Sequence, residues 1–256
     1  MNRIKFDENN IIKKINQGVE SNIYLYETNK NDKVALKIYK DKVIFGNIFN
    51  INNTVFPMTD EILKNKEKKL ELLEKESILK DEKPIDLVYN DDGKFVGYTR
   101  KIKKVQTFSD YSYKSKKTKI ELLKKLKEKM ELLNKNQIYI GDYNDSNFYL
   151  EDNEVKFFDT DSFHVKGFDF DFKNCFLNDY ESHNDKINNI DNYCFNYFTI
   201  AFYENMLLPY VKNHLVYNGL PFIFNTKENR KTLSYLLKCN VNNEYLLDHR
   251  KKGLFN

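Results

Sequence analysis

The sequence has no long apolar run, no paired cysteines and no histidine cluster. No stretch of about 18 apolar residues appears and no apolar segment stands near the N-terminus, so we expect neither a membrane span nor export. The three cysteines (Cys175, Cys194 and Cys239) lie far apart without CxxC spacing, which is typical of reduced thiols and not of disulfides or zinc ligands. The four histidines are equally scattered. Together these features predict a cytoplasmic protein.

The chain also has little net charge. Its 42 Lys and Arg residues nearly balance 38 Asp and Glu residues, so a formal charge of +4 gives no reason to expect nucleic acid as a partner. The basic runs at 101–104 and 114–119 are predicted to be solvated surfaces, with a docking surface for an acidic partner as the alternative. With 31% charged and 41% hydrophobic residues, the composition is typical of a folded globular protein.

Strand-forming runs dominate the first part of the chain. Short β-rich runs stand between turn-forming residues at 11–15, 23–26, 34–39, 87–89 and 95–98. Asp91-Asp92-Gly93 predicts a tight hairpin turn between the last two. Residues 40–58 are predicted to be an irregular Asn-rich insertion, and a helix is expected from Asp60, as its N-cap, to about Lys75.

The rest of the chain is predicted to be mainly helical. At about 117–135, apolar residues recur at spacings of three and four and form one buried stripe: Leu123, Leu126, Met130 and Leu133. The segment 190–208 is apolar almost all round, which is typical of a buried central helix. No Pro- or Ser-rich linker divides the chain. We therefore predict a single α+β domain over 1–256, with a β-rich N-lobe (about 1–101), a larger helical C-lobe (about 102–256) and a cleft between them.

Two polar stretches carry the chemical signal. Asp142 is followed five positions later by Asn147, between apolar stretches, and Asp159 ends a short strand-like run. Enzymes that transfer a phosphoryl group from a nucleoside triphosphate use an aspartate that accepts a proton, together with an asparagine and an aspartate that bind a metal ion. The alternative is that Asp142 and Asn147 form only a polar turn.

A phosphate-binding lysine is expected upstream. Strand alternation in 34–38 places Ala35 and Lys37 on one face, where a small residue leaves room for a flat base and the ammonium meets phosphate. An edge strand with a solvent-facing lysine is the alternative. The segment from Ile15 to Ile23 fits a hairpin that covers phosphates, although Gly18 is its single glycine and Ser21 stands at the last glycine position.

An inward lysine needs a carboxylate partner, and the helix at 60–75 offers several glutamates. We expect Glu67 to pair with Lys37, because Leu70 and Leu73 follow it at three and six positions, so that it can border the packed face. Glu71 is the competing choice.

These residues resemble the motifs of the protein-kinase-like superfamily along nearly the whole chain. Val34-Ala35-Leu36-Lys37 is similar to the family's Val-Ala-Ile-Lys strand, the segment 142–147 to its catalytic loop, and Asp159 to its Asp-Phe-Gly aspartate. Asp191 resembles the aspartate at the start of the family's central helix. The segments 88–98, 141–147 and 159–163 resemble a bacterial serine/threonine kinase-like branch with the patterns VYDxxGxFVGY, GDLNPxN and IDxDSFQ.

The resemblance implies a bilobal kinase fold that binds ATP and Mg²⁺ and phosphorylates a protein substrate. It implies that the nucleotide is bound by residues Ile15, Gly18, Ser21, Ile23, Ala35, Lys37 and Glu67. Asp142 would be the catalytic base, with Asn147 and Asp159 as metal ligands. Asn144 replaces the lysine that meets the γ-phosphate, Asp161 replaces a glycine and would add a metal-facing carboxylate, and Ile140-Gly141 replace the family's His-Arg.

Two other functions fit the same motifs. One is a kinase-fold phosphotransferase for a small molecule, or an ATPase of the tRNA-modification type, which the segment 17–21 and Gly141-Asp142 faintly resemble. The other is a pseudokinase that serves as a binding or scaffold module, which the single-glycine hairpin favours and the retained Lys37, Asp142, Asn147 and Asp159 oppose. The expected partner is a protein substrate, and a phosphatase or another protein of the same operon is a further candidate. No membrane partner is expected.

Overall fold

The computed structural model describes residues 1–45, 54–165, 167–168 and 190–205. It is a mixed α+β structure, as predicted. The described residues belong to two compact units, the first made of 1–104 with 167–168 and the second of 105–165 with 190–205.

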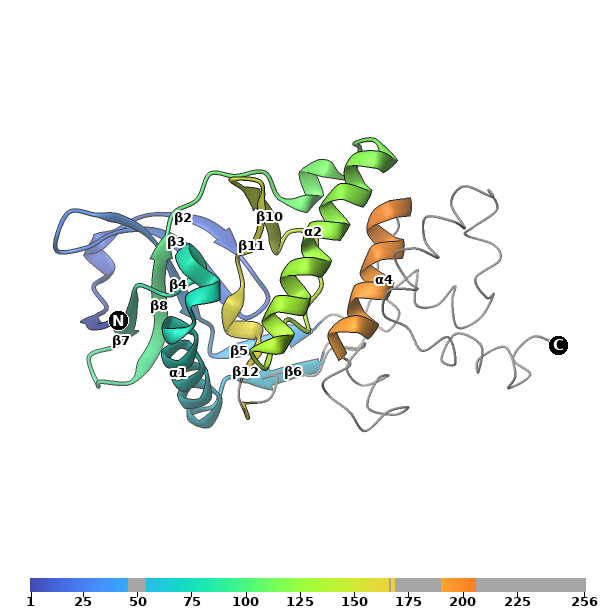
Figure 1. The fold of residues 1–256 in the computed structure, drawn as a ribbon. Coiled ribbons are helices and arrows are strands. Elements are labelled where there is room, and N and C mark those ends of the chain that lie inside the picture. The colour runs from blue at the N-terminus through green and yellow to red at the C-terminus, as the bar shows by residue number, and fades with distance from the viewer. Residues whose placement is uncertain (46–53, 166, 169–189, 206–256) are drawn as a thin grey trace. The chain divides into compact units, whose positions relative to one another are not determined.

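A six-stranded sheet forms the first unit, in the order β1–β7–β8–β4–β3–β2 (Figure 1). Its strands are β1 (Asn2–Lys5), β2 (Ile11–Gln17), β3 (Ser21–Glu27), β4 (Lys33–Tyr39), β7 (Asp86–Tyr89) and β8 (Phe95–Lys101). β1 runs parallel to β7 and the other neighbours are antiparallel. The structure confirms the five predicted strands, each of them longer than predicted, whereas β1 was not predicted.

Strand alternation in β4 separates two faces of the sheet. Val34 and Leu36 are buried in an apolar cluster with Tyr26 and Val88, and Ile38 packs against the cluster. Because successive side chains point to opposite faces, Ala35 and Lys37 lie on the other face, as predicted.

Helix α1 (Asp60–Lys75) packs against this sheet and buries Leu63, Leu70 and Leu73. Its N-cap is Thr59, whose hydroxyl accepts the Ile62 N–H at 3.3 Å, so the predicted Asp60 cap was wrong by one residue. A threonine oxygen satisfies the otherwise unpaired first amides, and Asp60 in the first turn complements the helix dipole.

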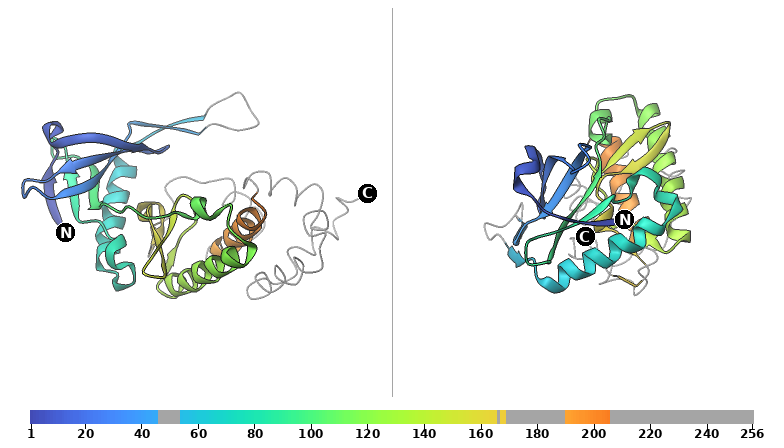
Figure 2. Two further views of the ribbon diagram at one scale, coloured as in Figure 1. Left: turned by 90° about the horizontal axis from the view of Figure 1, so that it is seen from above. Right: turned by 90° about the vertical axis from the view of Figure 1, so that its left-hand side faces the viewer.

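Part of the predicted irregular insertion is ordered as strands. β5 (Lys42–Phe45) pairs antiparallel with β6 (Thr54–Pro57), and Figure 2 shows them as a two-stranded ribbon extending from the sheet. Val43 is fully buried, which anchors the ribbon, whereas the opposed Ile44 and Val55 are exposed. The Asn-rich composition concealed these short β-branched runs. Residues 46–53 lie outside the described ranges.

The second unit combines two long helices with two short antiparallel pairs. Its elements are α2 (Lys116–Lys135), β9 (Ile138–Tyr139), β10 (Phe148–Glu151), β11 (Glu154–Phe157), β12 (His164–Val165) and α4 (Ile190–Glu204). β10 pairs with β11, and β9 pairs with β12. Short 3₁₀ helices occur in both units at Glu8–Asn10, Ser77–Glu82, Phe108–Tyr111 and Thr160–Ser162.

Helices α2 and α4 pack side by side (Figures 1 and 2). The predicted α2 stripe is fully buried at all four positions. Phe195, Phe198 and Phe202 of α4 are buried with Phe148, whose ring centroid lies 5.1 Å from that of Phe198. The burial predicted for α4 is therefore confirmed for the side chains that the structure describes, whereas 206–208 of the predicted helix lie outside the described ranges.

Buried Lys119 of α2 holds the C-terminal end of α4. Its Nζ donates to the carbonyl oxygens of Phe202 (2.9 Å) and Tyr203 (3.4 Å) and to the side-chain oxygen of Asn205. The last carbonyl groups of a helix lack partners within the helix and carry partial negative charge, so a buried ammonium both satisfies and neutralises them.

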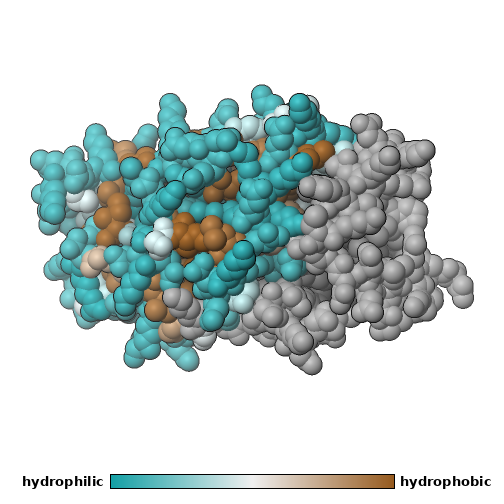
Figure 3. All heavy atoms as spheres, viewed as in Figure 1, coloured by the Kyte–Doolittle hydropathy of each residue, from teal (hydrophilic) through white to brown (hydrophobic). Residues whose placement is uncertain are grey.

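The described surface is mostly hydrophilic in the view of Figure 3, with smaller apolar patches. Within the described ranges, no helix combines the length and apolar character needed to cross a bilayer. Cys194 is a buried cysteine that forms no disulfide, and Cys175 and Cys239 fall outside the described ranges.

Candidate active site

The β10–β11 hairpin brings Asn147 and Asp159 to its open end. Asp152 and Asn153 form its turn with φ of 49° and 64°, as a type I′ turn requires. The register pairs Phe148 with Phe157, so Asn147 stands opposite Phe158, and the Phe158 N–H donates to the Asn147 carbonyl at 2.9 Å. Asp159 follows directly at this open end of the hairpin.

Asp142 lies beside Asn147 at the open end of the hairpin, because the two side chains are hydrogen-bonded to each other. The Nδ2 of Asn147 donates to Asp142 Oδ2 at 2.9 Å. Asp142 is exposed and Asn147 is half-buried. Because the amide nitrogen is directed at Asp142, the Oδ1 of Asn147 is left as an acceptor with no partner among the described residues. Two of the predicted catalytic and metal-binding residues are thus in direct contact.

The backbone before Asp142 is fixed by a buried carboxylate from α4. Asp191 accepts the N–H of Ile140 at Oδ2 and the N–H of Gly141 at Oδ1, both at 2.9 Å. The Asp142 N–H donates a hydrogen bond to the Ile140 carbonyl at 2.7 Å, which closes a tight turn at Gly141, whose φ is 66°. This tight turn requires positive φ, so a glycine suits the position where the kinase motif has an arginine.

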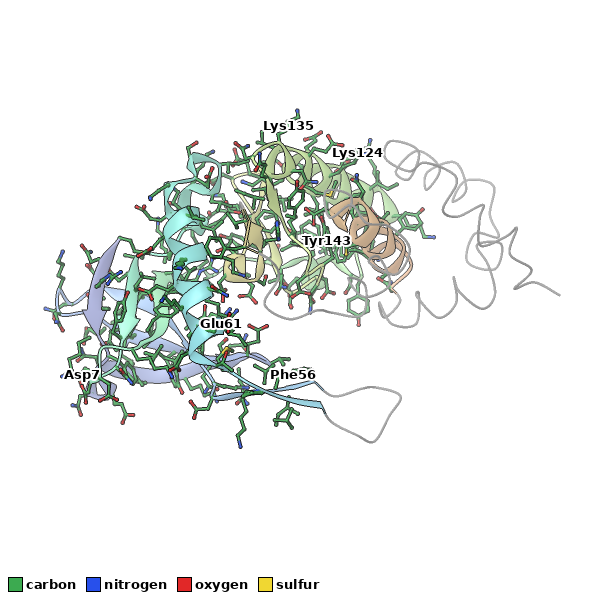
Figure 4. All side chains as sticks on the ribbon, turned by 90° about the horizontal axis from the view of Figure 1, so that it is seen from below. Asp7, Phe56, Glu61, Lys124, Lys135 and Tyr143 are labelled. Atoms are coloured by element: carbon green, nitrogen blue, oxygen red, sulfur yellow. The ribbon has the colours of Figure 1, made fainter. Side chains whose placement is uncertain are left out.

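The carboxyl group of Asp191 has a raised pKa because it is buried. Burial raises the pKa of Asp191 from 3.8 to about 7, although the hydrogen bonds from the Gly141 and Ile140 N–H groups and the nearby Tyr143 hydroxyl oppose the rise. Figure 4 labels Tyr143 beside α4, where its ring contacts Phe195 and Phe198. Burial and the nearby Asp191 carboxylate also raise the pKa of Tyr143 well above its usual value. Its hydroxyl lies near that carboxylate but outside strict hydrogen-bonding geometry.

The remaining predicted residues of this unit differ in exposure. Asp159 is half-buried and occupies the N-cap position of the 3₁₀ helix Thr160–Ser162 without a capping hydrogen bond from its side chain, whereas Asp161 is fully buried. The side-chain oxygen of Asn144 accepts the Ser146 N–H (3.1 Å) and hydroxyl (2.9 Å), so it stabilises the loop turn. In the described residues, no three His, Cys, Asp or Glu side chains are grouped for metal binding.

Lys37 of the first unit is buried on an internal strand. β4 lies between β3 and β8, and Lys37 is only 6% exposed, so the alternative of a solvent-facing lysine on an edge strand is wrong. Its Nζ lies 5.8 Å from the ring centroids of both Tyr39 and Tyr98, within the range of cation–π attraction. Ile23 pairs with Lys37 across β3, and Ala35 lies two residues before it on the same face.

Close strand packing at Lys37 depends on a glycine that sequence reasoning did not single out. Gly97 of β8 stands opposite Ile38, and a Cβ there would overlap the carbonyl oxygen of Lys37. A glycine within a strand signals such a close backbone approach, so the signal was present in the sequence.

The expected ion pair between Lys37 and Glu67 or Glu71 is not formed. Glu67 instead accepts the Tyr89 hydroxyl and pairs with Arg3 at 3.3 Å, and Glu71 pairs with Arg3 at 3.2 Å. The helix turns a lysine inward instead, because Lys66 continues the stripe of Leu63, Leu70 and Leu73 at spacings of three and four. The two glutamates border the packed face, as predicted for Glu67, but their partners there are Arg3 and Tyr89 and not Lys37.

The predicted phosphate hairpin is a tight turn between β2 and β3. The Gly18 N–H donates to the Ser21 carbonyl at 2.9 Å, and Gln17 pairs with Asn22. Ser21 is 3% exposed, whereas Ile15 on β2 is 45% exposed. The hairpin therefore exists as predicted, and the two side chains differ in their access to a ligand.

No protein-family model matches the chain, and no curated protein shows significant similarity to it.

Proposed function

We propose that the chain is an ATP- and Mg²⁺-dependent phosphotransferase with a bilobal protein-kinase-like fold, acting as a serine/threonine protein kinase. The observation that carries this proposal is the contact of Asp142 with Asn147 at the end of the hairpin where Asp159 also lies. Catalysis of phosphoryl transfer consists mainly of positioning the reactants and stabilising the charge on the phosphoryl group. These three side chains would supply a base and oxygen ligands for a metal ion in one place.

Asp142 would accept the proton of the substrate hydroxyl. Its exposure leaves the carboxylate open to a substrate, and the hydrogen bond from Asn147 fixes its orientation. The anchoring of Ile140 and Gly141 by Asp191 would keep the loop in place during turnover. Asn144 would serve the γ-phosphate less well than a lysine, since its oxygen already holds the turn.

The donor set fits Mg²⁺. Asn147 Oδ1 and the Asp159 carboxylate are hard oxygen ligands, and Mg²⁺ commonly takes only one or two protein ligands with phosphates and water completing its octahedron. Bound Mg²⁺ would neutralise the phosphate oxygens. Asp161 is a further oxygen donor two residues after Asp159. In the first unit, buried Lys37 would meet nucleotide phosphate, with Ala35 leaving room for the base.

Incubation with γ-labelled ATP and Mg²⁺ tests the proposal. Label on a serine or threonine of a protein supports the kinase, label on a small molecule indicates the small-molecule phosphotransferase, and free phosphate indicates an ATPase. Asp142→Asn should abolish transfer with ATP affinity nearly unchanged, whereas Asp159→Asn should also weaken Mg²⁺-dependent ATP binding. Asp145→Asn, which removes the same charge from the same loop, is the matched control and should leave transfer intact. Normal turnover in Asp142→Asn would rule out the proposed base.

A nucleotide-binding module without turnover is the second candidate. The contacts of Glu67 with Arg3 and Tyr89 favour it, because active protein kinases require an ion pair between the strand lysine and a helix glutamate. Binding of Mg·ATP without transfer of label to any acceptor would identify this module. In that case Asp142→Asn would change neither binding nor any measured turnover.

A further inference from the structure

Lys40, which follows β4, holds the tip of the β2–β3 hairpin (Gly18, Val19 and Glu20, called the hairpin tip). Its Nζ donates to the carbonyl oxygens of Gly18 at 2.6 Å and Val19 at 3.2 Å. Its backbone N–H donates to the Glu20 carbonyl at 2.9 Å. Three successive carbonyl groups therefore point at one residue.

This arrangement determines where the amides of the hairpin tip point. In a trans peptide the N–H lies opposite the C=O, and the chain has no cis peptide among its described residues. Because the carbonyls of Gly18 and Val19 both face Lys40 Nζ, the N–H groups of Val19 and Glu20 both face away from it. Neither N–H finds an acceptor in the part of the chain that the structure describes. Successive N–H groups directed to one side form an anion-binding concavity.

The conformation of the hairpin tip does not come from glycine. Gly18 has no left-handed φ, and a Cβ added there would meet only Ser21, at an ordinary 3.8 Å. The lysine contacts therefore shape the tip, where a glycine-rich loop would rely on backbone freedom.

A second contact fixes the hairpin tip to α1. Glu20 Oε2 lies 3.0 Å from Nζ of the fully buried Lys66, which also lies 5.0 Å from the ring centroid of Tyr39. Tyr39 is two residues from Lys37 on the same face of β4. A buried ammonium is costly without its carboxylate partner, so this pair resists movement of the tip.

We propose that Lys40 is a positioning residue that directs the Val19 and Glu20 amides toward nucleotide phosphates. The proposal rests on the proposed function, since it takes ATP as the ligand. Lys40 thus takes over the role of the glycines that the hairpin lacks, and the Glu20–Lys66 pair keeps the oriented tip in place.

Calorimetric titration of Mg·ATP and of adenosine into the full chain tests the proposal. Lys40→Met should weaken Mg·ATP binding about tenfold, because two amide hydrogen bonds to a charged acceptor are misdirected. Adenosine lacks phosphate, so its affinity should not change. Lys40→Arg, which retains donors for the carbonyls, should recover most of the ATP affinity. The matched control is Lys33→Met, which removes the same charge from the exposed start of β4 and should bind like the wild type.

The outcomes separate this proposal from the proposed function. Wild-type ATP affinity in Lys40→Met would overturn the role of Lys40 and leave ATP binding intact. Equal losses for ATP and adenosine would reveal a merely structural role and overturn it as well. If the wild type does not bind ATP, the proposed function fails, and inorganic tripolyphosphate becomes the probe for the same variants. About tenfold weakening in Lys40→Met then supports the hairpin tip as an anion site, and no binding by the wild type overturns it.

Discussion

Replacing Asp191 by asparagine should change how stability depends on pH. The folded pKa is raised from 3.8 to about 7, so between these values the folded chain keeps a proton that the unfolded chain has released. Each pH unit upward in this window therefore favours unfolding by about 1.4 kcal/mol. The stability linked to Asp191 is fully present below pH about 4 and is lost as the pH rises through about 7, in total about 4 kcal/mol.

Asparagine does not titrate, so the Asp191→Asn variant should lack this slope. It has one acceptor oxygen for two N–H groups, and misplacing one hydrogen bond costs about 1–3 kcal/mol at every pH. The variant should therefore be less stable than the wild type by about 1–3 kcal/mol at pH 4, where Asp191 is still protonated in the folded chain, and should match or exceed it at pH 8. Subtracting the free energy of unfolding of the variant from that of the wild type at each pH cancels the contributions of all other titrating groups.

Urea unfolding followed by far-UV circular dichroism at several pH values measures this difference, since the chain has no tryptophan for indole fluorescence. Hydrogen exchange at the Ile140 and Gly141 amides supplies a local check, because one of them should lose protection in the variant. A free-energy difference that stays constant within about 0.5 kcal/mol from pH 5 to pH 8 would refute the argument, as a buried acid with a raised pKa must produce a slope.

Two further substitutions test the packing of each unit. Gly97→Ala should destabilise the first unit by about 3 kcal/mol, because its Cβ overlaps the Lys37 carbonyl; Gly93→Ala, with φ of 74° in open space, should lose only about 1–2 kcal/mol. Equal losses in thermal unfolding would contradict the close approach of β4 and β8. Lys119→Met should lower the free energy of unfolding of the second unit by about 1–3 kcal/mol, because it leaves the Phe202 carbonyl without its donor; an unchanged urea midpoint would show that water replaces the ammonium.

Local patterns determined the secondary structure well where a strong period or a turn signal was present. The α2 stripe from Leu123 to Leu133, the alternation in β4 and the Asp91-Asp92-Gly93 turn all depend on neighbouring residues, so they could be predicted from the sequence. The segment 40–58 was predicted wrongly in part, because β5 and β6 are short and depend on pairing with each other.

The sequence by itself also singled out Asp142 and Asn147 as candidates, and the structure shows their side chains in contact, because their five-residue spacing spans a single loop. Only the tertiary structure decided which partners the charged groups take. Asp191 reaches Gly141 from fifty residues away, and Glu67 turns to Arg3 while Lys66 turns inward. A charge finds its partner through the packing of distant elements, and helical periodicity can place a glutamate at the border of the packed face without determining which charged group it meets there.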